Sequence, residues 1–444
     1  MASEWHETTL DQLGPIITGK TPSSSISGCF GGDIPFVTPI DFDGRRIIDS
    51  TARQLTEEGA DAVRSSRVRC LAVMVSCIGS DMGKTAIAGR ECVTNQQINS
   101  IVIDSSNDPY FVYYNLRNRK EEIQRAASGS AQPILNKSAF GKLKIQLPSL
   151  EDQRALARIL GSLDDKIELD RRMNETLEAM AQALFKSWFV DFDPVRARAE
   201  GRDPGLPELI ADLFPDRLVD SELGEIPEGW RVDALSNHLA ELEVGGRPKG
   251  GVSVYSNGVP SIGAESIVGL GVFNYSKTKY IPKDYFESML RGHIKSRDVL
   301  LYKDGGRPGV FEPHLTLVGD GFPFPVCAIN EHVYRIRACK ELGQNFLFFS
   351  LSSDVSMEEM RVKGTGVAVP GLNSTQVKSL TVLVPPPEIT AAFEATAGPL
   401  VSRLLSNCNE SRTLTTLRDV LLPKLISGEL RVSEAERVVA EVAA

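Results

Sequence analysis

Residues 151–189 read EDQRALARILGSLDDKIELDRRMNETLEAMAQALFKSWF, with no proline and no glycine after Gly161. The apolar residues repeat every seven positions at Leu156, Leu163, Leu177 and Leu184, with Leu160, Ile167 and Ala181 four positions after three of them. Such a stripe is typical of a helix in a coiled coil. Asp170 and Asn174 interrupt the stripe, and a polar residue there can fix the register of paired helices. The alternative is a helix that packs only on its own domain.

The chain contains an internal repeat that includes this helix. The matched positions are Trp5 with Trp230, Pro35 with Pro260, residues 92–95 (CVTN) with 327–330 (CAIN), residues 111–114 (FVYY) with 346–349 (FLFF), and Asn136 with Asn373. From residue 129 onward the offset between the copies stays at 237, and this register continues into the helix. Two copies of one unit, an α+β block followed by a helix, therefore make up the chain, which predicts pseudo-twofold symmetry.

The second copy of the helix, at residues 389–430, has the same apolar character. Each helix alone exposes an apolar stripe, so pairing buries both, and the pseudo-twofold axis makes the pair antiparallel. Pro423 is expected to end or kink the second helix near Leu422. The predicted seam of the coiled coil consists of Leu156, Leu163, Ile167, Leu177, Leu184, Leu400, Leu404, Leu414 and Leu421.

The two α+β blocks contain short β-rich runs between Gly, Pro, Asn and Asp residues, such as residues 71–75, 299–302 and 380–384. Residues 191–229 are rich in Pro, Gly and charge, which predicts a linker that crosses the molecule. The predicted organisation is a first block at residues 1–150, a helix at 151–190, the linker at 191–229, a second block at 230–388, a helix at 389–430 and a C-terminal tail at 431–444.

The helix length suggests a spacer. About 35 residues at about 1.5 Å each make a helix about 50 Å long, so an antiparallel pair would hold the two blocks tens of ångströms apart. Because DNA advances about 34 Å per turn, two such blocks could face one side of a duplex about a turn apart. This is the geometry of a target split into two half-sites.

The composition is that of a globular protein of two or three domains. The 444 residues are 42% hydrophobic, 24% charged and 7% aromatic. No stretch has the apolar length of a membrane helix, and the first ten residues hold no apolar signal region, so a soluble cytoplasmic protein without a membrane partner is expected. The seven cysteines are scattered without a C-x-x-C pair, which indicates neither a disulfide framework nor a cysteine zinc site.

The net charge of −9 at first argues against a nucleic-acid partner. The whole excess of acid lies in residues 151–229, which hold 10 basic and 19 acidic residues. Both α+β blocks are close to neutral, so local basic patches in them can still bind DNA.

Candidate catalytic motifs fail on spacing. Residues 79–85 (GSDMGKT) are one residue short of a phosphate-binding P-loop, and the second copy has no lysine there. Residues 107–110 (NDPY) resemble the NPPY motif of adenine methyltransferases but lack its second proline, and no glycine-rich cofactor loop precedes them. The five histidines have no metal-ligand spacing, and Asp164, Asp165 and Lys166 fit a solvated helix face. No catalytic residue and no metal ligand is therefore predicted.

With no catalytic motif, the sequence favours a binding function. Basic clusters that suit DNA lie beside Gly, Ser and Asn loops in both blocks. Lys and Arg suit phosphates, while Asn and Arg also suit base edges. The predicted DNA-binding residues are Lys84, Thr85, Arg64, Arg67, Arg69, Asn136, Lys137, Arg291, Lys295, Arg297, Arg307, Lys363 and Asn373. For the two asparagines, a turn or helix cap is at least an equal alternative.

Several stretches resemble the specificity subunit of type I restriction-modification systems. The resemblance rests on residues 147–169 (LPSLEDQRALARILGSLDDKIEL), 183–192 (ALFKSWFVDF), 223–230 (LGEIPEGW), 384–388 (VPPPE) and 421–430 (LLPKLISGEL). Residues 79–85 and 129–136 are also similar to recurring elements of the target-recognition domains in that family. Essentially the whole chain is covered.

The resemblance implies an α+β fold with two tandem target-recognition domains and an antiparallel coiled coil between them. Each domain would read one half of an asymmetric, bipartite site in double-stranded DNA. The chain itself would be a non-catalytic subunit without a cofactor. Two modification subunits would bring AdoMet-dependent adenine methylation, and two restriction subunits would add ATP- and Mg-dependent translocation and cleavage.

Two other classes of function stay open. One is a coiled-coil scaffold with two protein-binding modules and no DNA target. The other is an autonomous methyltransferase or nuclease, against which the missing cofactor loop and metal cluster speak. Sequence-dependent retention of DNA by a complex with the modification subunit separates the first from a specificity subunit, and AdoMet binding by the isolated chain would favour the second.

Overall fold

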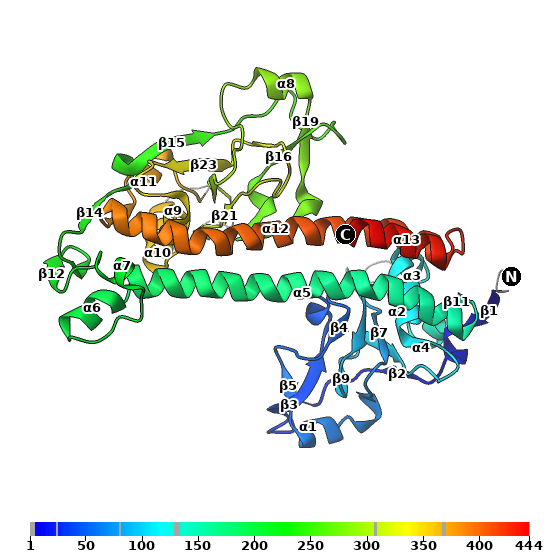
Figure 1. Ribbon diagram of the computed structural model, residues 1–444. Helices are drawn as coiled ribbons and strands as arrows, with labels where there is room; N and C mark the ends of the chain where they lie inside the picture. Colours follow the sequence, from blue (N-terminus) through cyan, green and yellow to red (C-terminus); the bar gives the residue numbers. More distant parts are fainter. Residues whose placement is uncertain are drawn as a thin grey trace. The chain divides into compact units, whose positions relative to one another are not determined.

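The computed structural model describes residues 5–23, 25–79, 81–127, 134–305, 309–365 and 370–443. The chain forms two compact units (Figure 1). Unit 1 consists of Met1–Glu168 and Thr413–Ala444, and unit 2 consists of Leu169–Arg412. The two long helices, α5 (Leu150–Phe189) and α12 (Pro387–Ile426), have 40 residues each and contribute to both units. Both predicted long helices are therefore present.

Helix α5 begins where the sequence offers a cap. The N–H of Asp152 donates to the hydroxyl of Ser149 at 3.2 Å, and that hydroxyl donates to the Asp152 carboxylate at 2.8 Å. This arrangement satisfies one of the N–H groups that a helix start leaves without an intrahelical partner. An acidic first turn, with Glu151 and Asp152, adds a favourable interaction with the helix dipole.

Helix α12 runs through two prolines. Of the two outcomes expected at Pro423, an end or a kink, the end near Leu422 is wrong, because α12 continues to Ile426. A proline removes only one helical hydrogen bond, and the last turn is kept by the N–H of Ser427, which donates to the carbonyl of Pro423 at 3.0 Å. Pro399 also lies within the helix.

The predicted seam is buried in both units. In unit 1, Leu156, Leu163, Leu414 and Leu421 belong to one core cluster, and the half-buried Ile167 packs against it. In unit 2, Leu404 belongs to the core cluster, and the half-buried Leu177, Leu184 and Leu400 pack against it. These side chains are apolar and lie on the stripe, so their burial is the reason that the helices pair.

Polar pairs within unit 2 show that the helices run antiparallel there. The hydroxyl of Ser411 donates to Asp170 at 3.3 Å, and Nδ2 of Asn407 donates to Oδ1 of Asn174 at 2.9 Å. Moving four residues up α5 thus corresponds to moving four residues down α12. The two polar interruptions of the stripe meet polar partners, so slipping the register would bury them unpaired.

The described residues of unit 1 form three sheets. A two-stranded sheet pairs β1 (His6–Thr9) with β11 (Lys144–Leu147). A five-stranded sheet has the order β2 (Ile16–Thr18), β10 (Ile98–Ile101), β7 (Val73–Ser76), β8 (Thr85–Ala88) and β4 (Ile47–Ile48). A four-stranded sheet has the order β5 (Gln54–Leu55), β3 (Phe30–Val37), β9 (Cys92–Thr94) and β6 (Arg67–Val68). The short helices are α1 (Glu57–Asp61), α2 (Pro109–Asn118), α3 (Lys120–Arg125), α4 (Lys137–Gly141), η1 (Leu10–Gln12), η2 (Pro39–Asp41) and η3 (Arg64–Ser66).

Unit 2 repeats these sheets, with one strand fewer in each of the two larger ones and with an additional strand pair, β17 (Ile267–Gly269) with β18 (Val272–Phe273). The repeated sheets are β14 (Arg231–Ala234) with β24 (Thr381–Val384); β15 (Leu239–Val244), β23 (Val333–Ala338), β20 (Val299–Tyr302) and β21 (Leu315–Leu317); and β19 (Lys279–Ile281), β16 (Val259–Ile262) and β22 (Ala328–Ile329). The short helices within these blocks are α8 (Lys283–Ser288), α9 (Gln344–Leu351), α10 (Asp354–Gly364), α11 (Ser374–Lys378), η4 (Leu235–His238), η5 (Ala264–Ser266) and η6 (Tyr275–Lys277).

The two units share one topology, as the repeat predicts. The pair β1–β11 corresponds to β14–β24, the antiparallel pair β7–β10 to β20–β23, and the parallel pair β3–β9 to β16–β22. The matched aromatic runs form α2 and α9, and both are buried. The aromatic residues thus supply the core that holds each set of sheets together.

The segment expected as a linker is folded. Residues 191–229 form α6 (Asp193–Ala199), α7 (Glu208–Ala211) and a hairpin of β12 (Leu218–Ser221) and β13 (Gly224–Pro227). The ring of Phe214 packs on that of Trp188 at 5.2 Å between centroids, and Val195 is fully buried. Apolar anchors thus fix the segment. The expected tail likewise contains a helix, α13 (Val432–Ala443).

Candidate nucleic-acid interface

In unit 1, three loops meet because two neighbouring strands are parallel. β3 and β9 pair with Val37 opposite Thr94, so both end at the same edge. Just beyond β9, the N–H of Asn95 donates to the carbonyl of Val37 at 2.9 Å. The loop after β2 joins them, since the N–H of Lys20 donates to the carbonyl of Thr94 at 2.9 Å. We call residues 19–21, 38–41 and 95–97 the loop edge of unit 1.

A glycine, an asparagine and a capping aspartate hold the backbone of this edge. A Cβ on Gly19 would lie 2.0 Å from the carbonyl oxygen of Asn95, so only glycine fits there. Oδ1 of Asn95 accepts the N–H of Gln97 at 3.0 Å, which closes an Asx turn. Asp41 accepts the N–H of Thr38 at 2.7 Å and so holds the backbone of residues 38–41, whereas Thr21 and Gln96 are joined through their side chains.

Unit 2 builds the same edge from the matched residues. Just beyond β22, the N–H of Asn330 donates to the carbonyl of Ile262 at 2.9 Å, and its Oδ1 accepts the N–H of His332 at 2.9 Å. The N–H of Gly245 donates to the carbonyl of Asn330 at 3.1 Å, and a Cβ on Gly245 would lie 1.7 Å from the carbonyl oxygen of Ile329. We call residues 245–247, 263–266 and 330–332 the loop edge of unit 2.

The side chains on the two edges differ. In unit 1, Lys20 and Gln96 are exposed, Oγ1 of Thr21 donates to Oε1 of Gln96 at 2.8 Å, and Ile40 is 88% exposed. In unit 2, Nε of the exposed Arg247 lies 2.8 Å from Oε1 of Glu331. The loop edge of unit 1 thus presents the neutral amide of Gln96 beside Lys20, and the loop edge of unit 2 presents the ion pair of Arg247 and Glu331.

A second ion-pair cluster flanks the loop edge of unit 2. Nδ1 of His332 lies 2.5 Å from Asp304, and Nζ of Lys303 lies 3.1 Å from the same carboxylate. The N–H of Lys303 donates to the carbonyl of His332 at 2.9 Å, which brings the end of β20 to this edge.

The predicted glycine turn, residues 79–85, starts at the loop edge of unit 1. The N–H of Cys77, which precedes it, donates to the carbonyl of Gln97 at 2.7 Å. The turn needs positive φ angles of 79° at Gly79 and 85° at Gly83. Lys84 is ion-paired with Asp81 at 2.8 Å, and the hydroxyl of Thr85 donates to the carbonyl of Gly83 at 3.3 Å.

The matched asparagines are helix caps. Oδ1 of Asn136 accepts the N–H of Ala139 at 2.9 Å at the start of α4, and Oδ1 of Asn373 accepts the N–H of Gln376 at 2.9 Å at the start of α11. The structure thus gives both side chains the capping role that the sequence left as the alternative. Lys137 is exposed in the first turn of α4.

The first predicted arginine cluster divides by environment. Arg67 is committed to three carboxylates, Glu57 at 2.5 Å, Asp61 at 3.1 Å and Glu91 at 2.8 Å. Arg64 and Arg69 are exposed. Arg64 lies on η3, which the hydroxyl of Ser66 ties to the carbonyl of Thr18 at 3.0 Å, next to the loop edge of unit 1.

Most of the predicted cations of unit 2 have local partners. Nζ of Lys295 lies 3.7 Å from Glu241, and Nη1 of Arg297 donates to Asn345 at 3.3 Å. Nζ of Lys363 lies 2.7 Å from Glu359 and donates to the carbonyl of Ser379 at 2.8 Å. Arg291 is exposed, and Arg307 lies outside the described residues.

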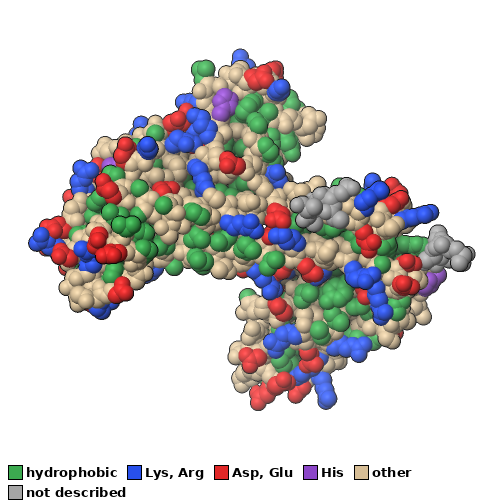
Figure 2. Space-filling model, in the orientation of Figure 1, with side chains coloured by type: hydrophobic (Ala, Val, Ile, Leu, Met, Phe, Trp, Pro, Cys, Tyr) green, Lys and Arg blue, Asp and Glu red, His purple; other side chains and the backbone are tan. Residues whose placement is uncertain are grey.

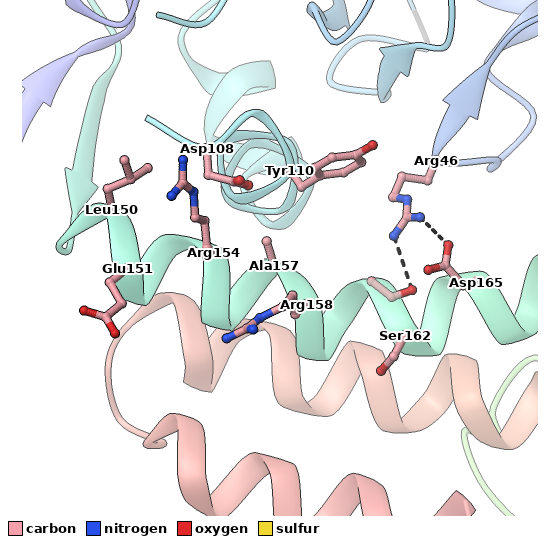
Figure 3. A pocket seen from close by; sticks show the side chains of 11 residues that line it. Arg46, Asp108, Tyr110, Leu150, Glu151, Arg154, Ala157, Arg158, Ser162 and Asp165 are labelled. Atoms are coloured by element: carbon pink, nitrogen blue, oxygen red, sulfur yellow. Dashed lines mark hydrogen bonds and ion pairs between the residues drawn. The ribbon is translucent and has the colours of Figure 1, made fainter. Parts of the chain in front are cut away.

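A groove of about 950 Å³ lies in unit 1 beside the first turns of α5 (Figure 3). Arg154 and Arg158 line it from the helix, and Arg46 reaches it from the sheet side. Arg46 donates to the carbonyl of Gly161 at 3.3 Å and is ion-paired with Asp165. The guanidinium of Arg46 thus connects the sheets to helix α5 through these contacts.

Basic and acidic side chains are interspersed on the face shown in Figure 2. Across the residues that the structure describes, no group of three or more His, Cys, Asp or Glu side chains is placed to hold a metal ion. Nor does any helix in the described ranges have the apolar length to cross a membrane. The loop edges are distinguished by their local geometry.

Sequence reasoning missed the side chains on the loop edges, namely Lys20, Thr21, Gln96, Arg247, Glu331 and His332. The signal that could have found them is the repeat itself. Its matched segment ends at Asn95 in one copy and at Asn330 in the other, and the next residues differ.

Known proteins resemble this chain along its length. The family model described as the type I restriction modification DNA specificity domain matches residues 2–179. The MjaIX specificity subunit, from a type I restriction enzyme of Methanocaldococcus jannaschii, is 27% identical over 438 residues, which cover 97% of this chain and 94% of that one. The HindI specificity subunit, from a type I enzyme of Haemophilus influenzae, is 28% identical over 69% of this chain and 73% of its own length.

The fold also has a solved counterpart. The S subunit of a type I restriction-modification system from M. genitalium superposes with a TM-score of 0.55 at 15% identity, over 95% of this chain and 96% of that one. At this identity the match supports the fold alone. The fold predicted from the repeat, mixed helix and sheet with two domains and two long helices, is confirmed.

Proposed function

We propose that this chain, a relative of the type I restriction enzyme specificity subunits over nearly its whole length, reads a bipartite DNA site for its partners. Each unit would recognise one half-site in double-stranded DNA. Two modification subunits would supply AdoMet and methylate adenine, and two restriction subunits would supply the ATP- and Mg-dependent cleavage. The chain itself would provide recognition and no catalytic residue.

One observation carries the proposal: the two loop edges share a backbone and differ in their side chains. Asn95 and Asn330 make matched hydrogen bonds to the neighbouring parallel strand, both at 2.9 Å. A scaffold that repeats while its exposed polar side chains change suits the recognition of two different short sequences. Sequence is read by hydrogen bonds to base edges, whereas contacts to phosphates only position the protein.

The experiment is to co-express the chain with its modification subunit in a host that lacks this methylation, and to map methyladenine by long-read sequencing. A new two-part motif with a fixed gap supports the proposal and reveals both half-sites. If a stable complex forms without any motif, while the same methyltransferase is active with another specificity subunit, the proposal fails. That result would favour a coiled-coil scaffold with two protein-binding modules.

A further inference from the structure

Each loop edge carries one pair of side chains that touch across two loops. In unit 1 the pair is Thr21 and Gln96, and in unit 2 it is Arg247 and Glu331, each joined at 2.8 Å. The two pairs occupy corresponding positions, since the first member precedes a proline and the second follows the turn asparagine. The same contact is thus made twice with different chemistry.

These pairs are not required to fold the loops. The backbone of each edge is fixed by a glycine that admits no Cβ and by an asparagine that closes the turn. Gln96 and Arg247 are exposed beyond that backbone. Resting on the proposed function, we infer that these two pairs are the principal base-reading groups, with an adenine read in unit 1 and a guanine in unit 2.

The guanine assignment follows from how Arg247 is held. Its Nε lies 2.8 Å from Oε1 of Glu331, and no acceptor among the described residues is hydrogen-bonded to its two Nη groups. An arginine fixed through Nε presents the Nη end of its fork, which matches O6 and N7 of guanine in the major groove. Glu331 acts as a positioning residue that orients the guanidinium.

The adenine assignment follows from Gln96. Its Oε1 accepts one hydrogen bond from the hydroxyl of Thr21, which fixes the orientation of the amide. A carbonyl oxygen has a second lone pair, and the amide nitrogen has two donors. Gln96 can therefore accept from N6 and donate to N7 of an adenine, the bidentate pattern by which glutamine reads this base.

The test compares methylation motifs of the complete complex carrying Arg247→Lys or Gln96→Ala, after co-purification with the modification subunit confirms assembly. Lysine keeps the charge of Arg247 but loses the fork. We expect R247K to lower the preference for one guanine in one half-site by about 10-fold or more, and Q96A to do the same for one adenine in the other, as loss of a bidentate contact does.

Matched controls replace the same residue types away from the loop edges. Arg217 is ion-paired with Glu228 at 2.5 Å on the β12–β13 hairpin, and Gln146 donates to Glu7 at 3.2 Å on β11. R217K and Q146A should leave both half-sites unchanged.

The outcomes are distinct. An unchanged motif in both loop-edge variants overturns the inference while the proposed function stands. So does methylation that weakens equally at all sequences, which would place these side chains on phosphates. A wild-type complex without a two-part motif overturns the proposed function itself.

Discussion

Asp164 of α5 anchors a buried polar network in unit 1, so the solvated helix face expected for it from the sequence is wrong. Its removal should destabilise unit 1 strongly. The carboxylate is 8% exposed. It accepts Nη1 of Arg418 at 2.6 Å and the hydroxyl of Tyr114 at 2.7 Å, so it joins α5, α12 and α2. Asp164→Ala leaves the buried guanidinium of Arg418 with only Asp419, whose side chain is 56% exposed.

The size of the effect follows from burial. Removing one partner of a buried ion pair costs about 3–5 kcal/mol, because the other charge stays buried without compensation. Unit 1 has about 200 residues, and a domain of this size loses about 2–4 °C of Tm per kcal/mol. We therefore expect D164A to lower the transition of unit 1 by about 10 °C.

The assay is differential scanning calorimetry of the full chain, with limited proteolysis to assign each transition to a unit. Two controls test the reasoning. The neighbouring Asp165 is 69% exposed in its ion pair with Arg46, so D165A should cost only about 1 kcal/mol or less. Replacing both charges, as in D164L with R418M, should recover most of the loss, since apolar residues of similar size remove the unpaired charge. A shift below 2 °C for D164A, or a double variant as unstable as D164A, would refute the reasoning.

Three further outcomes are expected. Asn373→Ala removes a helix cap and should cost about 1 kcal/mol in unit 2 without changing the methylation motif, whereas a changed motif would mean that the amide reads a base. Hydrogen bonding from Arg335 lowers the pKa of Glu241 below its usual 4.5, so this stabilisation is present above pH 4.5 and lost as the pH falls through the lowered pKa. The Tm of unit 2 should therefore fall as the pH drops below 4.5, and by less in E241Q. Among the seven free thiols only Cys70 is exposed, so a thiol reagent should find one fast-reacting group that C70S abolishes, and several fast groups would contradict the packing.

The sequence predicted the long helices because their signal is periodic. The heptad stripe of α5 needs no tertiary information, and Asp170 and Asn174 were identified as register residues that do meet polar partners. Residues 191–229 were misjudged because Pro and Gly mark tight turns as well as linkers. Only the burial of Phe214 and Val195 distinguishes the two cases.

The candidate site was predicted in outline and not in detail. The glycine turn at residues 79–85 does adjoin the loop edge of unit 1, through the hydrogen bond from Cys77 to Gln97. Charge alone could not show that Arg67 and Lys363 are committed to nearby carboxylates. Composition does not show which side chains are buried. Burial has chemical consequences, as it raises the pKa of the Cys77 thiol to about 11.

The sequence by itself determined the two-copy organisation, the paired helices and the resemblance to specificity subunits. Local periodicity and repeated segments, which can be detected in the sequence alone, indicate these properties. The tertiary structure alone decided which side chains meet at the two loop edges. Thr21 and Gln96 are 75 residues apart, and Arg247 and Glu331 are also far apart in the chain. They touch because β2 pairs antiparallel with β10 and β15 with β23, and a glycine without a Cβ at the end of β2 and of β15 lets the loops approach.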